Sequence, residues 1–162
     1  MPEFTSVGPE GYSCNHYTTT IELADVSNNT NIIQIILDSY EFDGPLAETT
    51  DCSNISEIIW YIMNFYGFNA KLVGNAGVYD GNVSGHMFVY VLVGDGTVVI
   101  DPTIGLNENR IGTIVVPPTG SLWSKGWVWD SPTEFLKVGH QDDMRGITLD
   151  TPIEELPIRR KS

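Results

Sequence analysis

Three side chains that could form a nucleophilic site occur along the chain in the order Cys52, His86 and Asp101. Cys52 begins an apolar run with helical spacing, His86 begins an apolar run of strand length, and Asp101 closes the run that follows. A cysteine thiol can attack a carbonyl when a histidine takes its proton and an acid orients that histidine. The order and spacing therefore predict a Cys–His–Asp site assembled from the ends of three separate elements.

The cysteine lies in the first turn of a predicted helix. Apolar residues follow it at the spacing of one helix face, namely Ile55, Ile58, Ile59, Ile62, Met63 and Tyr66. Thr49-Thr50-Asp51 supplies capping residues before the helix, and Gly67 stands in the C-cap position after it. Cys52 falls on the buried stripe, where the free N–H groups and the positive end of the helix dipole favour a thiolate. Its own backbone N–H can help to hold an oxyanion.

The histidine belongs to a predicted β-hairpin. His86–Val93 is apolar on both faces, which predicts a central buried strand with His86 at its mouth. Gly94-Asp95-Gly96 favours a hairpin turn, and Thr97–Ile100 is the expected return strand. The preceding segment, 74–85, holds four glycines and two asparagines, so we expect a loop of the kind that often lines binding sites.

A regular hairpin with its turn at Asp95-Gly96 would not bring the two side chains together. In that register Asp101 pairs with Tyr90. The offset from His86 to Tyr90 is even, which places His86 and Asp101 on the same face of the sheet. Their stagger of four residues is roughly 13 Å along the strand, too far for a hydrogen bond. The triad hypothesis therefore predicts a wider loop or a bulge that recentres the hairpin near Val93-Gly94.

The rest of the pattern predicts an α+β protein. Further elements are expected as a strand at 17–23, a helix over about 32–40, strands at 68–73 and 111–116, and a short helix at 131–137. A chain of 162 residues is long enough for one domain with a substantial core. We expect a single domain over 1–162, with its core at about 31–116 and irregular segments at 1–16 and 155–162.

Three tryptophans, Trp123, Trp127 and Trp129, cluster in a segment rich in Gly and Ser. Large aromatic side chains can wall a substrate groove, and they can also fill the edge of a core. Trp123 and Trp127 are therefore candidate substrate-binding residues, and a role in the core is the alternative.

The composition excludes some classes of partner. The chain has 21 acidic and eight basic residues and a formal charge of −13, whereas recognition of phosphates needs a basic face. We therefore expect no binding to nucleic acid. The sequence contains no apolar run of about 18 residues, and its start lacks the basic and apolar regions of a signal peptide. These features predict a cytoplasmic protein without a membrane span.

Two cysteines, Cys14 and Cys52, are too few for a disulfide scaffold. A single bridge between them is one alternative, and a free thiol at Cys52 is the expected state in an intracellular chain. Cys14 and His16 have the Cys-x-His spacing of half a metal site, but no second cluster supplies the remaining ligands. We expect neither a metal nor another cofactor.

Each candidate residue also has a purely structural interpretation. Cys52 could be a small buried residue beneath its helix, and His86 could be a strand-end histidine with satisfied hydrogen bonds. Asp101-Pro102-Thr103 could be a turn, because such sequences favour turns. The occurrence of all three residues at the ends of predicted elements favours a catalytic site. One of only two cysteines and one of only three histidines begin such elements. The alternative is a non-catalytic binding domain that keeps the fold as a scaffold.

Four segments together resemble the transglutaminase-like superfamily, which is related to papain and includes many cysteine peptidases of archaea and bacteria. The segments are Asp51–Asn54 at the start of a helix, Phe65–Lys71 leading into a strand, Gly85–Val89 and Val99–Thr103. The resemblance covers roughly 31–103, about half of the chain. Its most specific part is the combination of His86 with the later segment Asp101-Pro102-Thr103.

The resemblance implies a papain-like α+β core in which the cysteine helix packs on an antiparallel sheet. It also implies that Cys52 is the nucleophile, His86 the general base and acid, and Asp101 the orienting group. The implied reaction is acyl transfer on an amide of a peptide or protein, with water as the default acceptor and an amine as the alternative. One departure is Asp51, which replaces the small residue usual before the cysteine. A carboxylate there disfavours a thiolate unless it points away to cap the helix.

Overall fold

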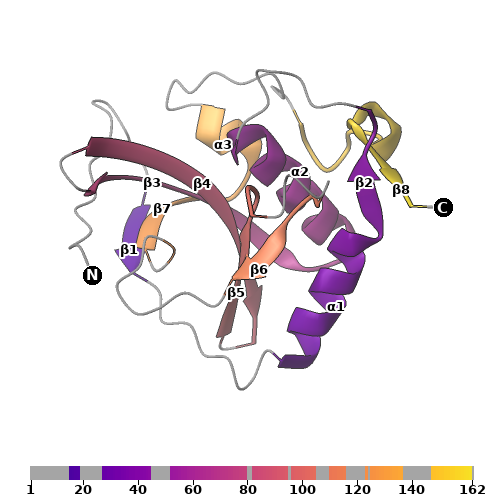
Figure 1. Cartoon of the computed structure of the whole chain (residues 1–162), viewed down its shortest axis with the longest axis horizontal. Coiled ribbons are helices and arrows are strands. Elements are labelled where there is room, and N and C mark those ends of the chain that lie inside the picture. Colours follow the sequence, from indigo (N-terminus) through magenta and orange to yellow (C-terminus); the bar gives the residue numbers. More distant parts are fainter. Residues whose placement is uncertain are drawn as a thin grey trace.

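The computed structural model describes residues 15–18, 27–44, 52–79, 82–94, 96–104, 110–115, 123, 125–136 and 147–161. Within these residues the protein is a mixed α+β structure in which helices pack against antiparallel sheets (Figure 1). The expected α+β class is therefore confirmed. None of the helices in these ranges is long and apolar enough to cross a membrane.

The main sheet has six strands in the order β1-β7-β3-β4-β5-β6, and every neighbouring pair is antiparallel. Its strands are β1 (Asn15–Thr18), β3 (Asn69–Tyr79), β4 (Asn82–Val93), β5 (Gly96–Asp101), β6 (Thr113–Val115) and β7 (Lys125–Trp129). A second sheet pairs β2 (Tyr40–Phe42) with β8 (Ile158–Arg160). Strands β3 and β4 form a long curved hairpin that extends beyond the rest of the main sheet (Figure 1).

The helices are α1 (Ser27–Asp38), α2 (Cys52–Phe65), α3 (Pro132–Leu136) and the 3₁₀ helix η3 (Ile153–Glu155). Helix α2 is central, because all its residues from Ser53 to Met63 are buried. One side of it packs in a large core with Met87, Val89 and Val91, which share one face of β4. Its other sides are covered by apolar residues of α1 and of the C-terminal segment, namely Ile33, Leu37, Ile147, Leu156 and Ile158.

The alternate residues of β4 form a second, smaller core on the opposite face of the sheet. Phe88 and Tyr90 pack there with Val73 of β3 and Val99 of β5, and all four are almost completely buried. The part of β4 from Met87 to Val91 is thus buried on both faces, as its continuous apolar sequence predicts.

Helix α2 ends as the sequence predicts. Gly67 has a φ of 92°, a left-handed conformation that glycine adopts without steric cost. The N–H of Gly67 donates to the carbonyl of Asn64 at 3.0 Å, and the N–H of Phe68 donates to that of Met63 at 3.0 Å. This pair of bonds is the Schellman motif, which satisfies two carbonyls at the end of the helix.

Two predicted boundaries near the hairpin are wrong. The glycine-rich segment 74–85 is not a loop, because β3 continues to Tyr79 and β4 starts at Asn82, and the two strands pair along this whole length. His86 therefore lies inside β4 and not at its mouth. Glycine is needed in β3 at Gly74, because a Cβ there would lie 2.7 Å from the ring of the buried Trp129.

The extents of the first helix and of the termini also differ from the prediction. Helix α1 ends at Asp38, and Tyr40 lies in β2 because it pairs with Arg160 of β8. The segment 155–162 is therefore not irregular as expected. At the other end, 1–14 lie outside the described residues, but Asn15 and His16 belong to β1. The core also extends past residue 116, since Trp129 and Ile158 belong to it.

The C-cap of α2 gives a prediction about stability. An added Cβ at Gly67 would meet no atom within 4 Å, so replacement tests backbone conformation alone. We expect Gly67→Ala to lower the free energy of unfolding by about 1–2 kcal/mol, because alanine pays the full cost of a left-handed conformation. Gly67→Asn is the matched control and should cost less, because asparagine tolerates this conformation. Denaturation in urea measures both, and equal stability of Gly67→Ala and the unmodified protein would contradict the assignment.

Candidate active site

The register of the β4–β5 hairpin decides whether His86 and Asp101 can meet. Val93 pairs with Gly96 and Val89 pairs with Ile100, so the strands are joined by two residues in a regular register. The predicted wide loop or bulge is therefore wrong. The turn begins one residue earlier than Asp95, at Gly94, whose φ of 57° lies in the left-handed region.

This one-residue shift of the turn halves the stagger between the two side chains. Continuing the register by one pair places Asp101 opposite Phe88, which is two residues from His86 on the same face of β4. Two residues correspond to about 7 Å along a strand, a separation that two side chains can span. His86 Nε2 and Asp101 Oδ2 are 2.6 Å apart, so the two groups form a hydrogen bond.

Asp101 is almost completely buried, with 1% of its surface exposed, and its carboxylate has several hydrogen-bond donors. Oδ1 accepts from the backbone N–H and the hydroxyl of Thr103, both at 2.8 Å, and from the N–H of Ile104 at 3.2 Å. Oδ2 accepts from the indole N–H of Trp123 at 2.8 Å, in addition to its bond with His86. The structural and functional interpretations of Asp-Pro-Thr thus coexist, because Oδ1 closes a local turn while Oδ2 binds the histidine.

Cys52 is the first residue of α2 and is half-buried against the large core. Its side chain interacts with the imidazole of His86, and this interaction contributes to the raised pKa of that group. Because Nε2 of the imidazole is bonded to Asp101, Nδ1 is the ring nitrogen available to the thiol. The structure therefore brings Cys52, His86 and Asp101 together in that order, from α2, β4 and β5.

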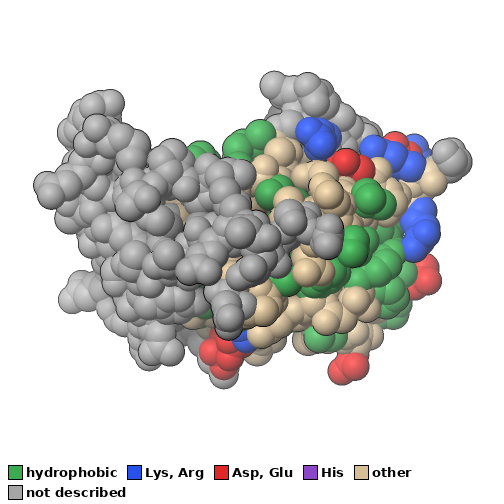
Figure 2. Space-filling model, turned by 90° about the horizontal axis from the view of Figure 1, so that it is seen from below, with side chains coloured by type: hydrophobic (Ala, Val, Ile, Leu, Met, Phe, Trp, Pro, Cys, Tyr) green, Lys and Arg blue, Asp and Glu red, His purple; other side chains and the backbone are tan. Residues whose placement is uncertain are grey.

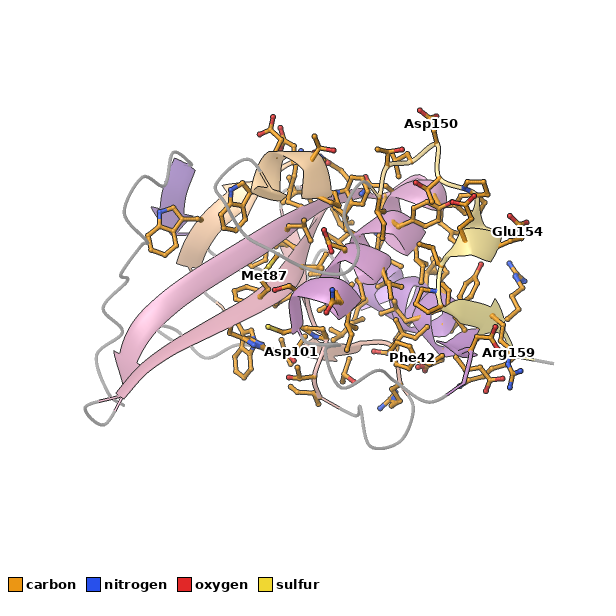
Figure 3. The ribbon with its side chains drawn as sticks, turned by 90° about the horizontal axis from the view of Figure 1, so that it is seen from above. Phe42, Met87, Asp101, Asp150, Glu154 and Arg159 are labelled. Atoms are coloured by element: carbon orange, nitrogen blue, oxygen red, sulfur yellow. The ribbon has the colours of Figure 1, made fainter. Side chains whose placement is uncertain are left out.

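The end of β5 explains how the helix reaches the histidine. The last residue of β5 lies opposite Phe88, so His86 projects beyond the part of β4 that pairs with β5. Figure 3 shows Asp101 near Met87 of β4 and well away from Arg159. Helix α2 packs against β4 with its first residue toward this place, which gives the thiol access to the imidazole.

The electrostatics of the pair follow from the same contacts. Burial alone would lower the pKa of His86, but its hydrogen bond with Asp101, its interaction with Cys52 and the charge of Asp101 raise it to about 9. Burial alone would raise the pKa of Asp101, but the hydrogen bonds from His86, Trp123 and Thr103 and the charge of His86 hold it far below its usual value. The site therefore favours an imidazolium beside an ionised carboxylate.

The two candidate substrate-binding tryptophans lie in different environments. Trp123 packs against the small core and donates its indole N–H to Asp101, and its carbonyl accepts from the hydroxyl of Tyr90 at 2.7 Å. Trp127 lies on β7 and is half-buried against the large core. A contact of either with substrate stays a prediction. Sequence reasoning missed the bond from Trp123 to Asp101, which no local pattern signals, whereas Thr103 is visible in the Asp-Pro-Thr turn signature.

Two residues that bear on the site, Cys14 and Asp51, lie outside the described residues. Cys52 carries a free thiol, so the alternative of a bridge between Cys52 and Cys14, which lies outside the described ranges, does not occur in the structure. Asp51, whose carboxylate would stand beside the thiol, is also outside them. Within the described ranges, no three His, Cys, Asp or Glu side chains are grouped so that they could hold a metal ion.

A separate pocket of about 400 Å³ lies at the other end of α2. Its lining includes Tyr40, Phe65, Ile158 and the two arginines Arg159 and Arg160. Figure 2 shows apolar and basic side chains side by side at the end of the molecule that carries β2 and β8. Cys52 and Phe65 are the first and last residues of α2, so the pocket is about 20 Å from the thiol and forms no part of this site.

Comparisons with protein-family models, with curated proteins and with solved structures gave no match to this chain. Function is therefore inferred from the geometry of the site and from the chemistry that its groups can perform.

The raised pKa of His86 predicts how stability depends on pH. A group whose pKa is higher in the folded state stabilises that state fully below its unfolded pKa of about 6.5. This contribution disappears as the pH rises through about 9. We therefore expect His86→Gln to lower the free energy of unfolding more near pH 6 than near pH 10, by a difference on the order of 2 kcal/mol.

Urea denaturation of the unmodified protein and of His86→Gln at both pH values measures this difference. Titrations of groups that do not interact with His86 are common to the two proteins and cancel in the comparison. In the matched background Asp101→Asn the pH-dependent difference should be smaller, because the carboxylate that contributes most to stabilising the imidazolium is absent. A cost of His86→Gln that is the same at both pH values would contradict the ion pair.

Proposed function

We propose that this protein catalyses cysteine-dependent acyl transfer on amide bonds, with water as the acceptor, as in a peptidase or an amidase. The observation that carries the proposal is the contact of one imidazole with both a thiol and a buried carboxylate. Covalent acyl transfer requires a nucleophile next to a base, and an acid that orients this base.

The first half of the reaction forms a thioester. His86 takes the proton of the Cys52 thiol, and the sulfur attacks the carbonyl carbon of the amide to give a tetrahedral intermediate. The protonated His86 then gives its proton to the departing nitrogen, the C–N bond breaks and the amine leaves. Asp101 stays ionised and stabilises the imidazolium through Oδ2, which is the role of the acid in such a triad.

The second half restores the enzyme. His86 takes a proton from a water molecule, and the resulting hydroxide attacks the thioester carbonyl. The carbon–sulfur bond breaks, the carboxylic acid leaves, and the proton returns to Cys52. The backbone N–H of Cys52 is a donor for the oxyanion in both halves, because the first N–H groups of a helix have no partner inside the helix.

As part of the same proposal, we assign the chain to the transglutaminase-like superfamily with a papain-like core. Features of the fold support this assignment. The nucleophile stands at the first turn of a helix that packs on an antiparallel sheet, and the histidine and aspartate come from two adjacent strands of that sheet. The substrate would then be an amide of a peptide or protein.

Two other readings of the site differ in testable ways. An amine could replace water as the acceptor, but a transamidase needs a second path for that amine, and water needs none. A non-catalytic scaffold would not need its thiol, imidazole and carboxylate together, whereas here His86 is bonded to Asp101 and interacts with Cys52. This contact favours catalysis over a scaffold role.

Alkylation of the thiol tests the proposal. Iodoacetamide near pH 7 should modify Cys52 at least tenfold faster than a model thiol, because an imidazolium beside the sulfur favours the reactive thiolate. In His86→Ala the rate should fall to that of the model thiol. Cys14 is the internal control, since peptide mapping measures both cysteines in one sample. The proposal that Cys52 is an activated nucleophile is wrong if Cys52 reacts no faster than Cys14 in the folded protein.

A further inference from the structure

We propose that Trp123 is a positioning residue, whose indole N–H holds the Asp101 carboxylate in the orientation that presents Oδ2 to His86. This inference rests on the proposed function, because it concerns how the same site is kept in register. It assigns to Trp123 a role other than contact with substrate. The observation behind it is the hydrogen bond of 2.8 Å from Trp123 Nε1 to Asp101 Oδ2.

The two oxygens of Asp101 have donors of different kinds. The donors to Oδ1 belong to Thr103 and Ile104, which lie two and three residues along the chain, so they fix the carboxylate only relative to its own turn. The partners of Oδ2 are His86 and Trp123, which are 15 and 22 residues away in sequence. These bonds connect the carboxylate to β4 and to the segment before β7, whereas the bonds to Oδ1 connect it only to its own turn. Of the two, the bond from Trp123 does not depend on the protonation of the histidine.

Trp123 is itself held by the strand that carries the histidine. The hydroxyl of Tyr90 donates to the carbonyl of Trp123 at 2.7 Å, and Tyr90 is completely buried. Tyr90 and His86 lie four residues apart on β4 and project from the same face. One strand therefore fixes both partners of Oδ2, directly through His86 and indirectly through Tyr90 and Trp123.

The same indole also lowers the cost of burying the carboxylate. A charged group that is removed from water is stable only when its oxygens receive hydrogen bonds. Trp123 packs against the small core, so it supplies apolar contact and a donor together. Loss of the donor leaves His86 as the one described partner of Oδ2, and the imidazole is then less well held with Nδ1 toward Cys52.

The variant Trp123→Phe tests this role, because it removes the donor and keeps an aromatic ring for packing. Its matched control is Trp60→Phe. Trp60 is a buried residue of α2 whose indole N–H donates at 2.9 Å to the backbone carbonyl of Asp130, so the control deletes an indole hydrogen bond away from the site. Both variants should lose stability, but only Trp123→Phe removes a bond to Asp101.

Two readouts separate positioning from a structural role. The first is the rate at which iodoacetamide modifies Cys52 near pH 7, which should fall about tenfold in Trp123→Phe, since a hydrogen bond to a charged group is worth at least that factor. The second is the titration midpoint of His86 by NMR, which should decrease, because a carboxylate that turns away from the imidazole stabilises the imidazolium less. Both quantities should stay unchanged in Trp60→Phe. Equal behaviour of the two variants in both readouts overturns the proposal.

The two readouts also distinguish this inference from the proposed function. If Cys52 of the unmodified protein is not activated, the proposed function fails, and the midpoint of His86 alone then decides the role of Trp123. If Trp123→Phe does not fold, as judged by its NMR spectrum, Tyr90→Phe takes its place. That variant keeps the ring and removes the bond to the carbonyl of Trp123, so the midpoint of His86 should decrease here too. An unchanged midpoint in a folded Tyr90→Phe overturns the proposal.

Discussion

The buried carboxylate of Asp101 is the constraint on which the candidate site depends. Only 1% of the surface of Asp101 is exposed, so its charge must be stabilised by hydrogen bonds. Donors from three parts of the chain bind this carboxylate. The turn after β5 supplies the N–H and hydroxyl of Thr103, β4 supplies His86, and the segment before β7 supplies Trp123. Fixing this carboxylate therefore fixes the relative positions of these segments.

Strand β4 connects this carboxylate with Cys52. One of its faces carries His86, Phe88 and Tyr90 over the small core, and the other packs against α2 in the large core. Because both faces are buried, a slip of one residue would exchange the two sets of side chains and is strongly disfavoured. The imidazole on the first face and the thiol at the start of α2 meet beyond the end of β5, where His86 extends past the part of β4 that pairs with β5.

Local sequence patterns predicted part of this arrangement and could not predict the rest. Helix α2 has a capping signal, a full apolar stripe and Gly67, so its bounds follow from neighbouring residues. The hairpin register does not, because Gly94-Asp95-Gly96 allows two overlapping two-residue turns, and pairing along the whole strand selects the earlier one. The bond from Trp123 and the pairing of β8 with β2 join distant segments, and they depend on tertiary packing that no local pattern encodes.

The central claim is that Cys52 forms a covalent acyl intermediate with the help of His86. The most direct measurement is mass spectrometry, with peptide mapping, of the protein quenched in acid after brief exposure to p-nitrophenyl acetate. The mechanism predicts one acetyl group on Cys52 that is lost in water without an added amine, and no such group in His86→Ala. A protein that is acetylated only at other residues, or equally at Cys52 with and without His86, would contradict it.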